Sequence, residues 1–128
     1  DRITVAWQSL SGGIDAVRAA RRSGSVWSGV TLALTSGRVS GIALTTDRTG
    51  TVTLAYGYSL NVDLPVLTTV RFDPFTRTWR EAGGFSGDSP VLSGTANDGA
   101  LLTWVQHPQP GAPTFIANTD FDATPRAP

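Results

Sequence analysis

Few side chains in this sequence could do acid–base or nucleophilic chemistry. His107 is the one histidine among 128 residues, and it stands in a polar His-Pro-Gln-Pro turn. A catalytic triad needs a nucleophile and an orienting acid beside such a base, and no Gly-x-Ser-x-Gly motif supplies the nucleophile. The ten acids include a single Glu, Glu81, and no two of them stand out as the carboxyl pair that glycoside hydrolysis requires. We therefore predict no catalytic residues.

Residues that bind metal ions are equally scarce. One histidine and no cysteine leave too few ligands for a zinc site. Three turns rich in Asp, at 47–50, 97–99 and 120–122, offer the oxygen atoms that calcium prefers. None of them has the spacing of an EF-hand loop, and Asp or Asn before Gly is common in ordinary turns. We predict neither a metal ion nor a cofactor.

Ligand-binding residues are expected in loops that vary between the copies of a repeat, because a rigid scaffold tolerates change there. The group that most resembles a site is Tyr58, Asn61 and Asp63, in which an aromatic ring stands beside hydrogen-bonding groups. Trp79 is a further candidate because it begins a predicted edge strand, where its ring could be exposed. We predict ligand binding at these four residues.

The candidates stand on a pattern that repeats about every 49 residues. Trp7, Tyr56 and Trp104 each end a segment of alternating apolar residues, which is the period of a β-strand. Tyr56 follows Trp7 by 49 positions, and Trp104 follows Tyr56 by 48. Because they lie on the apolar side of their strands, we expect these rings to pack between repeats rather than bind sugars. Further strands are predicted at 16–22, 65–71 and 113–119, from residues 24 and 76 onward, and at 41–46 and 90–95.

Four short antiparallel strands in each repeat predict an all-β fold built from β-propeller blades. The chain holds about two and a half repeats, at approximately 1–40, 41–88 and 89–122, followed by a tail at 123–128. Closed propellers have about four to eight blades. We therefore expect a single all-β domain that is completed either by the rest of a longer propeller or by further copies of the chain. A β-sandwich or a small barrel is the alternative architecture.

Two turns resemble those of known propeller families. The segment from Asp73 to Trp79 resembles the Asp-Pro-x-Thr-x-x-Trp turn of kelch-type blades. The segment from Gly24 to Trp27 is similar to the Asp-box turn of sialidase-like propellers. The Gly-Gly pair of kelch repeats is absent, since that position reads Tyr56-Gly57-Tyr58, and so are the Ser and Asp of the Asp box. The resemblance implies a divergent propeller, and neither family's ligand carries over.

All ten basic residues are arginines. Arg21-Arg22 and Arg71 fall at matching positions of the repeat and could bind a carboxylate, as the clustered arginines of sialidase-like propellers do. Alternation along a strand also turns one member of the Arg21-Arg22 pair toward solvent, which explains these residues without any ligand. Both interpretations stay open from the sequence.

The charges balance to a net charge of zero, so no long-range field directs the protein to nucleic acid or to an anionic membrane. No apolar run is long enough for a transmembrane helix. The chain begins at Asp1 and has no Met, which suggests a processed protein that is secreted or displayed on the cell surface. We expect a non-catalytic module that binds a glycan or a protein partner. The alternatives are a fragment of a propeller enzyme such as a glycan hydrolase, and a structural subunit of a larger assembly such as a homo-oligomer.

Overall fold

The computed structural model describes residues 2–35, 37–59, 65–97, 99–106 and 113–121. These residues form ten β-strands and no helix, which confirms the all-β class. The strands are β1 (Arg2–Ser11), β2 (Ile14–Ser23), β3 (Val26–Thr35), β4 (Arg38–Thr46), β5 (Val52–Ser59), β6 (Val66–Asp73), β7 (Thr78–Ser86), β8 (Asp88–Gly94), β9 (Ala100–Gln106) and β10 (Phe115–Phe121).

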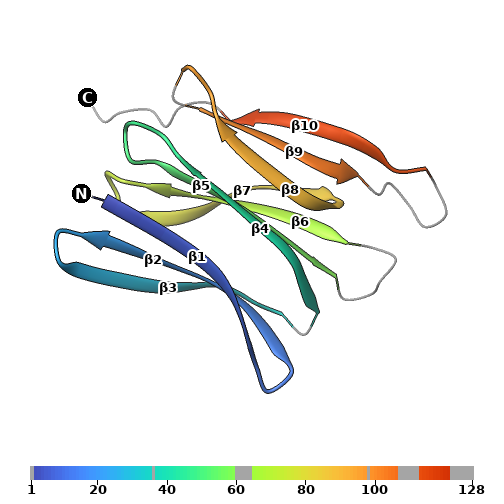
Figure 1. Ribbon diagram of the computed structural model, residues 1–128, viewed down its shortest axis with the longest axis horizontal. Coiled ribbons are helices and arrows are strands. Elements are labelled where there is room, and N and C mark those ends of the chain that lie inside the picture. The colour runs from blue at the N-terminus through green and yellow to red at the C-terminus, as the bar shows by residue number, and fades with distance from the viewer. Residues whose placement is uncertain (1, 36, 60–64, 98, 107–112, 122–128) are drawn as a thin grey trace.

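The strands form three antiparallel sheets that follow one another in chain order (Figure 1). The N-terminal sheet has the order β1-β2-β3, the middle sheet β4-β5-β6-β7, and the C-terminal sheet β8-β9-β10. Within each sheet, strands that are consecutive in the sequence pair antiparallel. The chain passes from one sheet to the next between β3 and β4 and between β7 and β8, which do not pair with each other. The turn between β1 and β2 consists of Gly12 and Gly13 with φ of 59° and 79°, the two positive values that a tight type I′ hairpin needs.

Corresponding strand pairs of different sheets each carry one register shift. The pairing of β2 with β3 shifts between Val17 and Arg18, and that of β6 with β7 shifts between Thr69 and Val70. The first and second strands of the middle and C-terminal sheets also carry one shift each, in the pairs β4–β5 and β8–β9. The register identifies equivalent positions, because each recurring aromatic faces one residue of the following strand. These pairs are Trp7 with Arg18, Tyr56 with Thr68, and Trp104 with Ala117.

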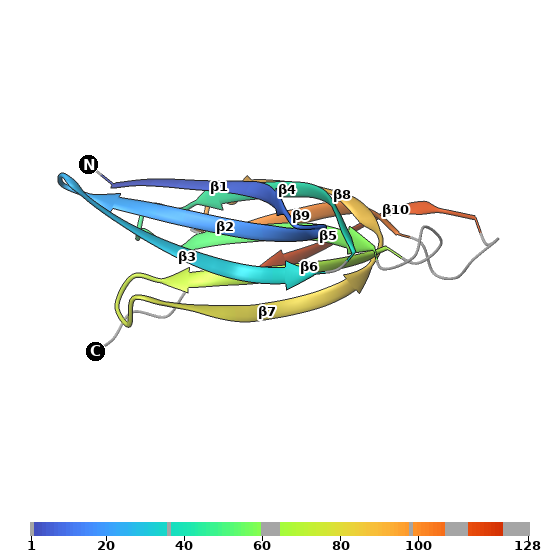
Figure 2. The ribbon, with the colours of Figure 1, turned by 90° about the horizontal axis from the view of Figure 1, so that it is seen from below.

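The three sheets spread apart from their first strands. β4 lies against β8, and the contacts with β8 become fewer from β4 through β5 to β6. β4 also meets β1 and β2 of the N-terminal sheet. Figure 2 shows the sheets overlapping in projection, with β7 at the outer side of the middle sheet. The middle sheet is therefore covered on both faces, and no sheet closes into a barrel.

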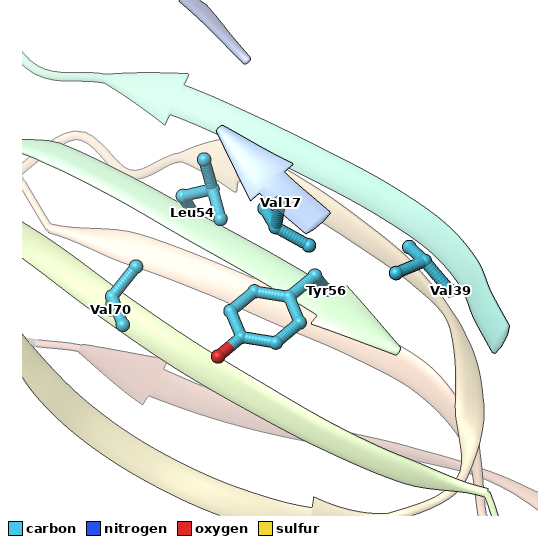
Figure 3. Close-up of a cluster of buried hydrophobic side chains, with 5 residues drawn as sticks. All are labelled: Val17, Val39, Leu54, Tyr56 and Val70. Atoms are coloured by element: carbon cyan, nitrogen blue, oxygen red, sulfur yellow. The ribbon is translucent and has the colours of Figure 1, made fainter. Parts of the chain in front are cut away.

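A hydrophobic core fills each of the two interfaces between sheets. Between the N-terminal and middle sheets, Val17 of β2 packs with Leu54 and Tyr56 of β5, and with Val39 and Val70 (Figure 3). Between the middle and C-terminal sheets, the buried residues are Ala55, Leu67, Leu102 and Trp104. The alternation of β5 explains both cores, since successive side chains point to opposite faces of the sheet.

One polar contact accompanies each of these cores. The Oδ2 atom of Asp15 accepts a hydrogen bond of 2.8 Å from the backbone N–H of Val39, which links β2 to β4. At the other interface, the indole N–H of Trp104 donates to the backbone carbonyl of Ser86 at 3.2 Å. Both sheet interfaces therefore have directional bonds in addition to apolar packing.

The recurring aromatics differ in their exposure. Tyr56 and Trp104 keep only 7% and 4% of their surface exposed, which confirms that they pack between sheets. Trp7 is 41% exposed, so the prediction that it packs between repeats is wrong for the described part of the chain. The reason is its position: it lies on the face of the N-terminal sheet that points away from the middle sheet.

Candidate functional site

A pocket of about 470 Å³ lies between the N-terminal and middle sheets, within the usual size range of small-molecule sites. It is found where β1 begins, where β2 turns into β3 and where β6 turns into β7. Four arginines contribute to its lining, namely Arg2, Arg21, Arg22 and Arg77. The remaining described wall is largely apolar and includes Val26, Val30, Phe72, Pro74 and Trp79.

The turn between β6 and β7 positions one side of the pocket. The Oδ1 atom of Asp73 accepts hydrogen bonds from the backbone N–H groups of Phe75, at 2.8 Å, and Thr76, at 3.4 Å. This is the local bonding that makes Asp a turn former. The turn ends at Arg77, which has the left-handed φ of 58° and whose N–H donates to the carbonyl of Asp73 at 2.8 Å. A non-glycine residue in this conformation is uncommon and is often found at functional sites.

Arg21 and two aromatic rings form a stack along the pocket. The guanidinium carbon of Arg21 lies 3.7 Å from the centre of the Phe72 ring. Phe72 in turn meets Trp79 edge to face, with ring centres 5.4 Å apart. Cation–π and aromatic contacts of this kind fix the orientation of a planar guanidinium. Arg21 is therefore held in place although no carboxylate among the described residues is seen to pair with it.

The electrostatics of the pocket favour a negative charge. Partial burial lowers the pKa of Arg21, and the nearby positive charges of Arg2 and Arg77 lower it further. Arginine nevertheless stays protonated in proteins, so three like charges share this space. The Nη1 atom of Arg21 is buried and has no hydrogen-bond partner among the described residues. The described lining residues include no Asp or Glu, so an anion would supply both the missing charge and the missing acceptor.

Arg22 also lines the pocket, but its guanidinium contacts a different ring from that of Arg21. Its guanidinium carbon lies 5.8 Å from the centre of the Trp27 ring, which is paired with it across the sheet. Alternation along β2 places Arg22 on the face that points away from the middle sheet. Its Nε atom is buried without a hydrogen-bond partner in the described part of the chain. The prediction that the two arginines point to different sides of the sheet agrees with these contacts.

The residues predicted to bind a ligand do not come together. Trp79 lines the pocket. Tyr58 is half-buried beside Tyr56, with ring centres 6.4 Å apart, and it pairs with Val66 at the other end of the middle sheet. Six residues of β5 separate Tyr58 from the pocket end, which is about 20 Å at the usual rise of a strand. Tyr58 and Trp79 therefore belong to different regions of the molecule.

Other predicted candidates lie outside the described residues or have structural partners. Asn61, Asp63 and His107 fall in the parts of the chain that are not described. Asp47 uses its Oδ1 atom to accept hydrogen bonds from the backbone N–H groups of Thr49 and Thr51, as a turn residue does. Among the described residues, no three side chains of the His, Cys, Asp or Glu type come close enough to hold a metal ion.

Arg71 is placed away from the pocket. Its Nε atom donates to the Oγ1 atom of Thr53 at 3.1 Å, and its guanidinium lies 5.9 Å from the Phe121 ring of the C-terminal sheet. The register makes Arg71 equivalent to Arg21, and Phe121 equivalent to Phe72. The same Arg–Phe contact is thus made at both sheet interfaces.

Sequence reasoning missed Arg2 and Arg77. Neither arginine has a counterpart at the period of about 49 residues. Arg2 lies at the start of the first repeat, and Arg77 lies near the end of the second. Arg77 did carry one signal, because it lies inside the turn that resembles a kelch blade.

The comparisons with known proteins add no assignment: no protein-family model, no curated protein and no solved structure matches this chain. In the part of the chain that the structure describes, no helix is long and apolar enough to cross a membrane.

Proposed function

We propose that the three sheets are consecutive blades of a β-propeller. The proposal is supported by the meander order of each sheet and by the one register shift that each of these equivalent strand pairs carries. It is further supported by the way the sheets approach each other at their first strands and diverge outward, as blades do around a central axis. A β-sandwich, the alternative, would pack two sheets with aligned strands, whereas here a third sheet continues the series.

We infer that the protein is a non-catalytic binding module whose pocket takes an acidic sugar. The observation that carries this inference is the convergence of Arg2, Arg21 and Arg77 in one pocket whose described lining has no carboxylate. Guanidinium groups match the planar, bidentate geometry of carboxylates and also bind sulfate oxygens. The described lining has no Asp or Glu, so these residues supply neither the acid nor the nucleophile of a glycoside hydrolase. Binding is therefore favoured over hydrolysis.

The apolar wall supports a sugar rather than a bare inorganic anion. Trp79 and Pro74 border the same space as the arginines. The C–H face of a sugar ring can pack on such surfaces while its acidic group meets the arginines. This combination points to a uronic acid or a sulfated sugar, and an exposed acidic side chain of a protein partner is the competing ligand. A location outside the cell or on its surface, which we also propose, would expose the site to acidic glycans.

Isothermal titration calorimetry with a short hexuronic acid oligosaccharide tests this function. The oligosaccharide should bind, its neutral counterpart should not, and raising the salt concentration should weaken binding because the attraction is between charges. The substitutions Arg21→Gln and Arg77→Gln should each weaken binding by about tenfold to a hundredfold, the loss expected for one hydrogen bond to a charged group.

The matched control is Arg38→Gln. Arg38 is exposed and pairs with Ser59, far from the pocket, so its loss should leave binding unchanged. A sulfated oligosaccharide and a poly-glutamate peptide serve as further titrants, and tighter binding of the peptide would favour a protein partner. Equal binding of acidic and neutral sugars, or an equal loss in the Arg38→Gln variant, would contradict the proposal.

A further inference from the structure

The two sheet interfaces are built from equivalent residues. In each, a row of alternating side chains on the second strand of one sheet packs against the preceding sheet. We call it the aromatic row: on β5 it is Val52, Leu54 and Tyr56, and on β9 it is Ala100, Leu102 and Trp104, all of them buried. The preceding sheet receives each row on β2 or β6, the strands that pair with β1 and β5. There the equivalent residues Val17 and Leu67 are fully buried.

The outer faces of the first and last sheets repeat this construction but lie exposed. On β1 the aromatic row is Ile3, Val5 and Trp7, which are 39%, 41% and 41% exposed. On β10 the residue equivalent to Val17 and Leu67 is Ile116, which is 66% exposed. Among the described residues, nothing covers the aromatic row of the N-terminal sheet or the receiving face of the C-terminal sheet.

The charges at these two faces are complementary. At both internal interfaces an arginine of the receiving face lies over the ring of a phenylalanine of the next sheet, Arg21 at 3.7 Å and Arg71 at 5.9 Å from the ring centre. On the outer face of the C-terminal sheet the position of these arginines is taken by Asp120, which is exposed. On the outer face of the N-terminal sheet the position of the phenylalanines is taken by Arg22. Where the internal interfaces have an arginine and a phenylalanine, the two outer faces therefore have Asp120 and Arg22, which carry opposite charges.

We propose that a second copy of this chain docks here, with the outer face of its C-terminal sheet on the outer face of the N-terminal sheet. Asp120 of one copy then meets Arg22 of the other, and Ile116 packs against the row that ends at Trp7. The contact joins two different surfaces, so repeating it produces a ring or an open filament. Two copies supply six sheets, since each has three, and six lies within the about four to eight blades of closed propellers. A closed dimer is the expected form.

The test is the mass of the 128-residue chain in solution, by size exclusion with light scattering over a range of concentrations. The wild type should show twice the chain mass of 13.5 kDa. Each charge reversal, Arg22→Asp or Asp120→Arg, should raise the dissociation constant by about 30-fold or more, as expected when like charges face each other in an interface. The double variant, which restores opposite charges, should recover the dimer.

The control is Arg38→Asp, a charge reversal on β4 that does not lie on either outer face. It should leave the mass unchanged, and circular dichroism should show that every variant keeps the β-sheet signal. A wild type that stays monomeric at all concentrations would overturn the proposal. So would an oligomer that resists both reversals, or single variants that dissociate without being rescued by the double variant. None of these outcomes depends on sugar binding.

Discussion

Replacement of Asp15 by alanine should destabilise the contact between the N-terminal and middle sheets. Asp15 lies near the start of β2 and is only 4% exposed. Its Oδ2 atom accepts two hydrogen bonds of 2.8 Å. The donors are the side-chain amide of Gln8 and the backbone N–H of Val39. Val39 is buried, so its N–H has no access to water once the carboxylate is gone.

The size of the effect follows from the two donors separately. A buried donor that loses its partner costs about 1–3 kcal/mol, and this applies to the Val39 N–H. Gln8 is exposed, so its amide returns to water and adds little. Asp15→Ala should therefore lower the free energy of unfolding by about 1–3 kcal/mol. Asp15→Asn keeps an acceptor but loses the charge, which should cost about 1 kcal/mol.

Urea-induced unfolding followed by circular dichroism measures these differences, provided that the slope of the free energy with urea is unchanged. The matched control is Gln8→Ala, which leaves the bond to Val39 in place and should cost less than either change at Asp15. Hydrogen exchange at the Val39 amide should accelerate most in Asp15→Ala. A loss below about 0.5 kcal/mol for Asp15→Ala, within the usual range of surface substitutions, would refute the argument that this bond holds the sheets together.

Two further predictions concern the backbone and the pH dependence. Gly87 has φ of 142°, and an added Cβ would collide with the carbonyl of Val105 and lie 2.8 Å from the Trp104 ring. Gly87→Ala should therefore lower the free energy of unfolding, measured in urea, by about 2–4 kcal/mol. Gly24→Ala, with φ of 62° and open space around it, should cost only about 1 kcal/mol, and equal losses would argue against the collision. Burial raises the pKa of Tyr56, so the folded state favours the neutral phenol. The free energy of unfolding should therefore be constant up to the unfolded pKa of about 10 and fall as the pH rises from there toward the folded pKa. Unfolding measured from pH 8 to 12 should show this fall in the wild type and a smaller one in Tyr56→Phe, whereas identical pH profiles would contradict it.

The secondary structure could be predicted because it depends on neighbours in the sequence. The alternation around Tyr56 and Trp104 has the two-residue period of a strand, and glycines and Asp residues separate the strands. The hairpins within each sheet could be expected from the short turns between their strands. The equally short connection between β7 and β8 leads to a new sheet instead, which turn length alone does not predict. The match between the segments around Arg21-Arg22 and Arg71 was correct within one position. Only the register of the paired strands identified Arg21, rather than Arg22, as the equivalent of Arg71.

The candidate site could not be predicted in the same way. Arg2, Arg21 and Arg77 lie on three different elements, and their proximity depends on how the N-terminal sheet packs against the middle sheet. Tyr58, Asn61 and Asp63 were grouped because they are close in the sequence. The pocket instead brings together residues of two sheets that are far apart in the sequence. The sequence offered Trp79 and Arg21 separately as candidates, and it gave no reason to group either of them with Arg2 and Arg77.

The sequence by itself determined the all-β class, the strand period and the scarcity of histidine and cysteine, because these depend on residue types and local alternation. The tertiary structure alone decided which faces are covered. It buries Tyr56 and exposes Trp7, although both end the same repeated pattern, because within the described residues a preceding sheet packs against Tyr56 and none packs against Trp7. It also brings the arginines together, since the distance between side chains on separate sheets is a property of packing and not of spacing along the chain.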